Sequence, residues 1–181
     1  KSNTTANNNT AVGYQAGYAN TTGVNITAVG KGALYNNTAN QNTAVGYHAL
    51  YANTTGYYNV ATGEQSLLAN TTGLNNTAYG FSALQANTTA SNNTAVGFQS
   101  GYYNTTGTSN VFIGGQDAGG FAAGLYNTTG SYNTMVGAGA LKSNTTANNN
   151  TAVGYQAGYN NTTGTQIDAF GYQAGYSNTT G

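Results

Sequence analysis

The sequence predicts an all-β fold, a β-solenoid (β-roll or β-helix) in which ten coils of about 17 residues stack into a rod. One observation is a short motif, Asn-Thr-Ala-Val-Gly at residues 9–13, which returns at 42–46, 93–97 and 150–154. Another is the even spacing of the glycine that closes each full or looser copy: Gly13, Gly30, Gly46, Gly63, Gly80, Gly97, Gly114, Gly137, Gly154 and Gly171. Units this short cannot bury a core alone, so they must stack.

Each unit is expected to run strand, turn, strand, turn. Residues 9–12 alternate and include β-branched side chains, which suits a short strand that ends at Gly13. A second short strand is expected at residues 14–18 and at the equivalent positions of later units. The turn that follows is Asn-Thr-Thr-Gly, as at 20–23, because Asn and Gly both tolerate left-handed backbone. Helices are not expected in units so rich in Gly, Asn and Thr.

Residues 1–181 are predicted to form a single repetitive domain, a segment of a longer fibre protein. Residues 142–159 repeat residues 1–18 without a difference, which indicates recombination within a longer array. Neighbouring anchor glycines are 16 or 17 residues apart, but Gly114 and Gly137 are 23 apart. We therefore expect an insertion near residues 115–126.

The interior is predicted to be narrow and lined by alanine. The position two before each anchor glycine holds Ala in every unit except two, which carry Phe112 and Met135 beside the insertion. We expect those larger side chains to fill space left by the longer coil. Asn9, Asn42 and Asn93 are expected to stack inward as a ladder. The opposite arrangement, with valine inside and alanine outside, is the alternative.

The residue directly before the anchor glycine is then expected to face outward, because side chains alternate along a strand. An outward apolar row of this kind marks a contact surface. We predict self-association of the chain, as a homo-oligomer or filament, along this self-association stripe: Val12, Val29, Val45, Tyr79, Val96, Ile113, Val136, Val153 and Phe170.

Tyrosines form two further rows. One follows the anchor glycine (Tyr14, Tyr47, Tyr155 and Tyr172) and one lies four residues later (Tyr18, Tyr35, Tyr51, Tyr102, Tyr159 and Tyr176). The main interpretation is stacking between coils; the other is an aromatic platform for sugars.

The ionisable side chains give no support to an enzyme. Glu64, Asp117 and Asp168 lie about three coils apart in succession, roughly 14 Å at ~4.8 Å per coil, which is too far for paired-carboxylate hydrolysis. His48 has no acid or nucleophile in register, and the chain has no Cys for thiolate ligands. No catalytic residue, cofactor or metal site is predicted. The absence of Arg argues against nucleic-acid binding, and no apolar run is long enough to span a membrane.

The motif Asn-x-Thr is the acceptor sequence for N-linked glycans. It recurs as Asn-Thr-Thr at the turns, and a second Thr at each turn exceeds what the turn itself requires. Covalent glycans are predicted at this row: Asn3, Asn20, Asn36, Asn53, Asn70, Asn87, Asn104, Asn127, Asn144, Asn161 and Asn178. Matches at Asn8, Asn25, Asn75, Asn92 and Asn149 are interpreted as incidental, and turn and ladder propensity is the alternative explanation for all of them.

Residues 10–13 with their copies, and the small residues Ala16, Ala33 and Ala49 that follow, resemble the head repeats of YadA-like trimeric autotransporter adhesins. The units are similar also to repeat arrays of phage-like tail-fibre proteins. The resemblance covers essentially the whole chain and implies a left-handed β-roll, commonly trimeric, on a cell or virion surface. These units differ from the usual head repeat in being longer and in carrying Asn-Thr-Thr turns.

Three functions follow from these patterns. The first is a structural segment of an extracellular or surface fibre that is self-associating and glycosylated at its turns. The second is an adhesin or receptor-binding tail fibre that recognises surface glycans through its Tyr and Thr rows. The third is an ice-binding solenoid, because rows of Thr on a β-solenoid resemble ice-binding surfaces; a turn makes a poor flat face, so this ranks last.

Overall fold

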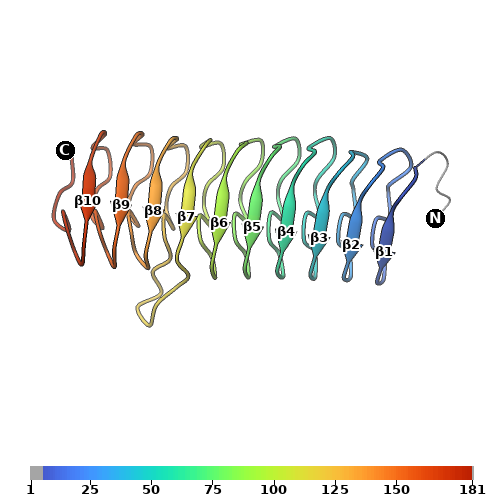
Figure 1. The fold of residues 1–181 in the computed structure, drawn as a ribbon, viewed down its shortest axis with the longest axis horizontal. Helices are drawn as coiled ribbons and strands as arrows, with labels where there is room; N and C mark the ends of the chain where they lie inside the picture. Colours follow the sequence, from blue (N-terminus) through green and yellow to red (C-terminus); the bar gives the residue numbers. More distant parts are fainter. Residues whose placement is uncertain (1–5, 181) are drawn as a thin grey trace.

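The computed structural model describes residues 6–180, which form a single rod of stacked coils (Figure 1). Each coil contributes one three-residue strand, and the strands join in sequence order into one parallel sheet. The strands are β1 (Thr10–Val12), β2 (Thr27–Val29), β3 (Thr43–Val45), β4 (Val60–Thr62), β5 (Thr77–Tyr79), β6 (Thr94–Val96), β7 (Val111–Ile113), β8 (Thr134–Val136), β9 (Thr151–Val153) and β10 (Asp168–Phe170). The predicted all-β solenoid is confirmed. No helix among these residues could cross a membrane.

Stacking keeps every coil in the same register. Ala44 of β3 pairs with Ala61 of β4, and equivalent positions pair along the whole sheet. The hydrogen bonds continue beyond the strands, as in Leu50 N–H to the Ser66 carbonyl at 3.0 Å and Thr54 N–H to the Thr71 carbonyl at 2.9 Å. Each coil is therefore bonded to its neighbours around much of its circumference, which makes the rod stiff.

The predicted second strand is wrong. Residues such as 47–51 form a run of turns, because His48 and Leu50 adopt left-handed backbone with φ of 53° and 51°. A strand needs negative φ at every position. The same two positions have positive φ in most coils, occupied by Gln, Ser, Leu or Gly.

Alanine faces inward and valine outward, which confirms the predicted sides of the strand. The strand alanines of β2 to β6 are fully buried, whereas Val12, Val45 and Val96 are exposed. Asn42 and Asn93 are also fully buried, as expected for an inward ladder, while Asn9 in the first coil is half-buried. The arrangement with valine inside is excluded.

A row of leucines, which the sequence interpretation did not single out, completes the core. Leu34, Leu50, Leu67, Leu84 and Leu141 are fully buried opposite the alanines. Equivalent positions in other coils hold glycine, and at two of these, Gly101 and Gly124, larger strand residues take the place of the leucine. A Cβ atom at Gly101 would lie 2.8 Å from Phe112, and one at Gly124 would lie 2.5 Å from Phe112. Phe112 and Met135 therefore replace missing leucine side chains, rather than filling space from the longer coil as predicted.

The insertion leaves the coil at Gly114 and rejoins it at Ala123. The Ala123 N–H donates to the Gly114 carbonyl at 3.0 Å, which closes the loop. The equivalent bond in a regular coil joins Ala49 to Gly46. Figure 1 shows the extra residues projecting from the rod between β7 and β8, so the register of the sheet is unaffected.

The volume exchange can be tested by moving the side chain. Phe112→Ala should lower the free energy of unfolding by about 3–5 kcal/mol, because it leaves a cavity between two glycines. Adding Gly101→Leu should recover part of that loss, since Leu at this position packs against a strand alanine in coils such as that of Leu84. Chemical denaturation measures both variants, and a double variant no more stable than Phe112→Ala would contradict the exchange.

Candidate functional site

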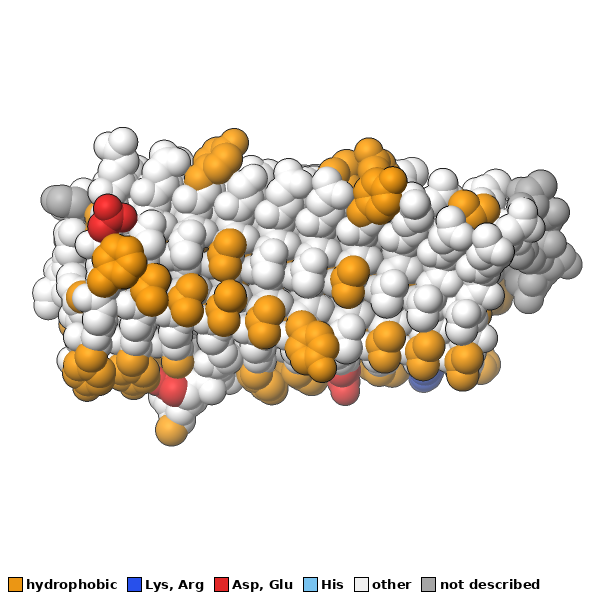
Figure 2. Space-filling view, in the orientation of Figure 1, with side chains coloured by type: hydrophobic (Ala, Val, Ile, Leu, Met, Phe, Trp, Pro, Cys, Tyr) orange, Lys and Arg blue, Asp and Glu red, His pale blue; other side chains and the backbone are white. Residues whose placement is uncertain are grey.

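The outward apolar row runs the length of the sheet as a diagonal band (Figure 2). One coil breaks the row, because β4 carries Thr62 at this position. Tyr79 is 61% exposed and Ile113 is 39% exposed in single rods. Val29, Val136 and Val153 are half-buried by their neighbours in the row. The stripe therefore occupies the predicted face and is open to contact.

A few charged residues of both signs border the stripe: Lys31 and Glu64 stand two residues after the stripe position of their coils, and both are exposed. Asp168 is the only charged residue in the ten strands, and it lies at the last of them. The row beside the stripe holds mostly Thr, with Val60 and Val111 adding apolar surface. The chain carries no net charge, so two copies meet no net electrostatic repulsion when they approach.

The Asn-Thr-Thr asparagines form a ladder inside the rod. The Asn70 Nδ2 donates to the Asn53 Oδ1 at 2.8 Å and to the Gly73 carbonyl at 3.0 Å. Asn87 donates to Asn70 in the same way at 2.8 Å. Both amide hydrogens are therefore used. The fully buried members are Asn37, Asn53, Asn70, Asn87, Asn104, Asn127, Asn144 and Asn161.

The predicted glycosylation row is thus poorly placed in the folded chain. Asn20 and Asn178 at the ends are half-buried, and Asn3 lies outside the described residues. In the short coil the ladder position belongs to Asn37, not to Asn36, which the sequence interpretation had chosen. A sugar on a fully buried Nδ2 would displace a hydrogen bond and require space that the interior lacks. Occupancy of these sequons stays a prediction that the geometry disfavours.

The first Thr of each turn also has a structural role, because its hydroxyl group bonds to the next coil. The Thr54 Oγ1 donates to the Thr71 carbonyl at 3.0 Å, and Thr71 donates to Thr88 at 3.1 Å. The second Thr, such as Thr55 or Thr72, is exposed. The hydroxyl groups of the first Thr column therefore donate to carbonyl oxygens along the rod, which places them poorly for binding ice.

A second amide ladder lies just before the strands. The Asn59 backbone N–H donates to the Asn42 Oδ1 at 2.9 Å, and the Asn59 Nδ2 donates to the Gly73 carbonyl at 2.8 Å. Asn76 repeats the pattern one coil later. Within residues 6–180, no buried side-chain nitrogen or oxygen lacks a partner.

The tyrosine rows stack between coils, as the main interpretation predicted. The ring centroid of Tyr35 lies 4.9 Å from that of Tyr18 in one neighbouring coil and 4.9 Å from that of Tyr51 in the other. Tyr159 stacks on Tyr176 at 4.9 Å. Partial burial, followed by the neighbouring Tyr51 and Tyr18, raises the pKa of Tyr35.

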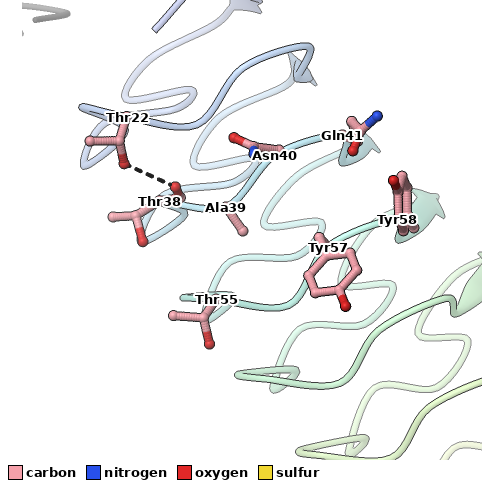
Figure 3. Close-up of a pocket in the computed structure, with 8 residues that line it drawn as sticks. All are labelled: Thr22, Thr38, Ala39, Asn40, Gln41, Thr55, Tyr57 and Tyr58. Atoms are coloured by element: carbon pink, nitrogen blue, oxygen red, sulfur yellow. Dashed lines mark hydrogen bonds between the residues drawn. The ribbon is translucent and has the colours of Figure 1, made fainter. Parts of the chain in front are cut away.

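A hollow of about 530 Å³ interrupts the turn surface at the short coil (Figure 3). Asn37 and Asn42 are five residues apart there, so the turn lacks one residue relative to its neighbours. Thr22, Thr38 and Thr55 contribute one hydroxyl from each of three coils. Tyr57 and Tyr58 form the aromatic side of the hollow, with their rings edge to face at 5.1 Å.

Two charged residues, Lys142 and Asp117, anchor the insertion. The Lys142 Nζ lies 4.1 Å from the Phe121 ring centroid and 2.9 Å from the Tyr159 hydroxyl. Desolvation alone would raise the pKa of Asp117, but hydrogen bonds from the Tyr155 hydroxyl and from backbone N–H groups hold that pKa below its ordinary value. The loop is therefore held by side-chain contacts as well as by backbone.

The other predicted ionisable residues are not brought together. His48 stacks on Tyr47 at 3.9 Å, and no group of three His, Cys, Asp or Glu side chains occurs among the described residues. Comparison of the chain with protein families, curated proteins and solved structures gives no match. Any function proposed for this chain therefore rests on the geometry of its own surface.

Asn70 belongs to the buried ladder, whereas Asn75 is exposed, so the same substitution should affect stability unequally at the two positions. Asn70→Gln should lower the free energy of unfolding by about 2 kcal/mol or more, because a longer amide cannot keep both ladder bonds in a full interior. Asn75→Gln should change it by less than about 0.5 kcal/mol, since Asn75 is exposed and Gln41 occupies the equivalent position. Urea denaturation measures both; equal effects would contradict the ladder's role.

Proposed function

We propose that the chain is a structural segment of an extracellular or surface fibre, in which rods join laterally through the self-association stripe. Support comes first from mechanics: coils are hydrogen-bonded to their neighbours both within and beyond the strands, so the element is long and stiff. It comes second from the surface, which offers an apolar row and no cluster of catalytic or metal-binding groups among residues 6–180.

The observation that carries the proposal is the exposed stripe itself. Its members recur at the same strand position in successive coils, so two copies placed side by side share one spacing. Each contact then repeats along the rod, and weak contacts add up over its length. A second copy of this chain is therefore a better-matched partner for the stripe than an unrelated surface.

Placing charge in the stripe tests lateral association. A Val45→Lys, Val96→Lys variant should remain folded, because both side chains are exposed in the single rod. It should no longer associate, since each ammonium group would be buried unpaired in the contact. The matched control is Thr72→Lys, Thr106→Lys, which adds the same charge at exposed turn positions.

Sedimentation velocity and electron microscopy measure the outcome. The wild type and the turn control should form larger particles or bundles, and the stripe variant should sediment as a single rod. A stripe variant that assembles like the control would overturn the proposal.

A second candidate function, an adhesin that recognises glycans, is favoured by the hollow at the short coil. Sugar-binding sites combine aromatic faces with hydroxyl and amide groups. Tyr57 and Tyr58 supply the faces, and Asn40, Gln41 and Thr38 supply polar groups around them. The hollow is centred on the short coil and is not repeated in every coil, which suits recognition of a ligand rather than building of a fibre.

Binding to immobilised glycans would test the hollow. Tyr57→Ser, Tyr58→Gln should abolish binding, and both replacements have precedents at the same positions in other coils, such as Ser91 and Gln41. Tyr132→Gln is the control, because Tyr132 is exposed in the same row as Tyr58 but lies outside the hollow. Wild-type protein that binds no glycan, or equal binding by all three proteins, would count against the adhesin.

A further inference from the structure

A second row of sequons lies on the outside of the rod. Every coil has one non-glycine residue in left-handed backbone two positions before its strand begins, with φ between 57° and 62°. All of these residues are exposed except Ser109, which is half-buried. The row consists of Asn8, Asn25, Gln41, Tyr58, Asn75, Asn92, Ser109, Tyr132, Asn149 and Gln166.

The first residue of each strand lies two positions after this row, and its identity is related to that of the row. Wherever the row holds Asn, the strand begins with Thr, which completes Asn-x-Thr. The strands that begin with another residue, at Val60, Val111 and Asp168, all belong to coils without Asn in the row. The other two coils without Asn, which carry Gln41 and Tyr132, still begin their strands with Thr. Left-handed backbone alone explains Asn, which tolerates it. It does not explain why Thr accompanies each Asn, whereas an acceptor sequence does.

The amides of this row also have room for a substituent. The Asn75 Nδ2 donates one hydrogen bond, to the Asn92 Oδ1 at 3.2 Å, at the exposed surface. Asn8 donates to Asn25 in the same way. An N-linked sugar replaces one of the two hydrogens on Nδ2, so this bond can persist. By contrast, Asn70 uses both hydrogens inside the rod.

We infer that the exposed asparagines are the glycan attachment sites of the rod, in place of the buried turn row: Asn8, Asn25, Asn75, Asn92 and Asn149. A glycosyltransferase joins the Asn Nδ2 to C1 of a sugar supplied as an activated glycosyl diphosphate. The C1–O bond to the diphosphate breaks, the diphosphate leaves, and Nδ2 loses one proton. The inference rests on the proposed location outside the cell, because an exported chain meets the transferase on its way out.

Glycans in this row would border the strand face without covering the stripe. Asn92 and Val96 are four residues apart, which is at most about 13 Å because Asn92 itself is not extended. The Thr row lies between them. Sugars would therefore hydrate one edge of the face and leave the apolar row free for a second rod.

Glycopeptide mass spectrometry of the full chain, secreted by its own producing cells, tests the assignment. Peptides containing the exposed asparagines should be heavier by whole sugar units, with the sugar located on those residues by electron-transfer fragmentation. Peptides containing Asn53, Asn70 or Asn87 should have their bare mass.

A paired substitution isolates the acceptor sequence. Thr77→Val should remove the sugar from Asn75 and keep the fold, because Val begins the equivalent strand at Val60. Thr43→Val is the control: Gln41 stands two residues before it, so the mass of its peptide should change only by the substitution. Bare exposed asparagines, a sugar that survives Thr77→Val, or sugars confined to the buried row would overturn the inference.

This result is independent of the fibre proposal. Bare rods that still bundle through the stripe would reject the glycans and keep the fibre. Glycosylated rods that never associate would reject lateral assembly and keep the glycans.

Discussion

The structure depends on keeping buried amides satisfied in a narrow interior that is filled mainly by Ala, Asn and Leu. A buried amide without partners costs as much as several favourable contacts supply. Stacked coils solve this because their spacing of about 4.8 Å lets one amide bond to the next. The solution works only when successive coils place Asn at the same point, as Asn53, Asn70 and Asn87 do. That requirement explains why the turn Asn returns in every coil.

The sequence predicted the coil number, the strand positions and the two faces of each strand, because side-chain alternation and periodicity report on burial directly. It did not predict the backbone of the second segment. His48 and Leu50 are in left-handed conformation, which is uncommon for residues other than Gly and above all for Leu, so propensity pointed to a strand. The conformation is imposed by stacking, since Leu50 is fully buried and bonded to the next coil.

The two sequon rows show a different limit. Asn70 and Asn75 both begin an Asn-x-Thr motif, and the sequence alone favoured the more regular of the two rows. Regularity, however, is what a ladder demands, whereas a surface site tolerates gaps such as Tyr58. In a repeat protein the invariant position is therefore the structural one, and the intermittent position is where surface chemistry varies.

Coils of unusual length follow the same logic. The short coil opens a hollow beside Tyr58, and the long coil projects its extra residues between Gly114 and Ala123, yet both leave the sheet in register. Changes in length are absorbed at the turns because the strands are fixed by pairing on both sides. The strand face thus stays uniform, which suits lateral contact between identical rods, while the turns are free to diverge, which suits recognition of other molecules.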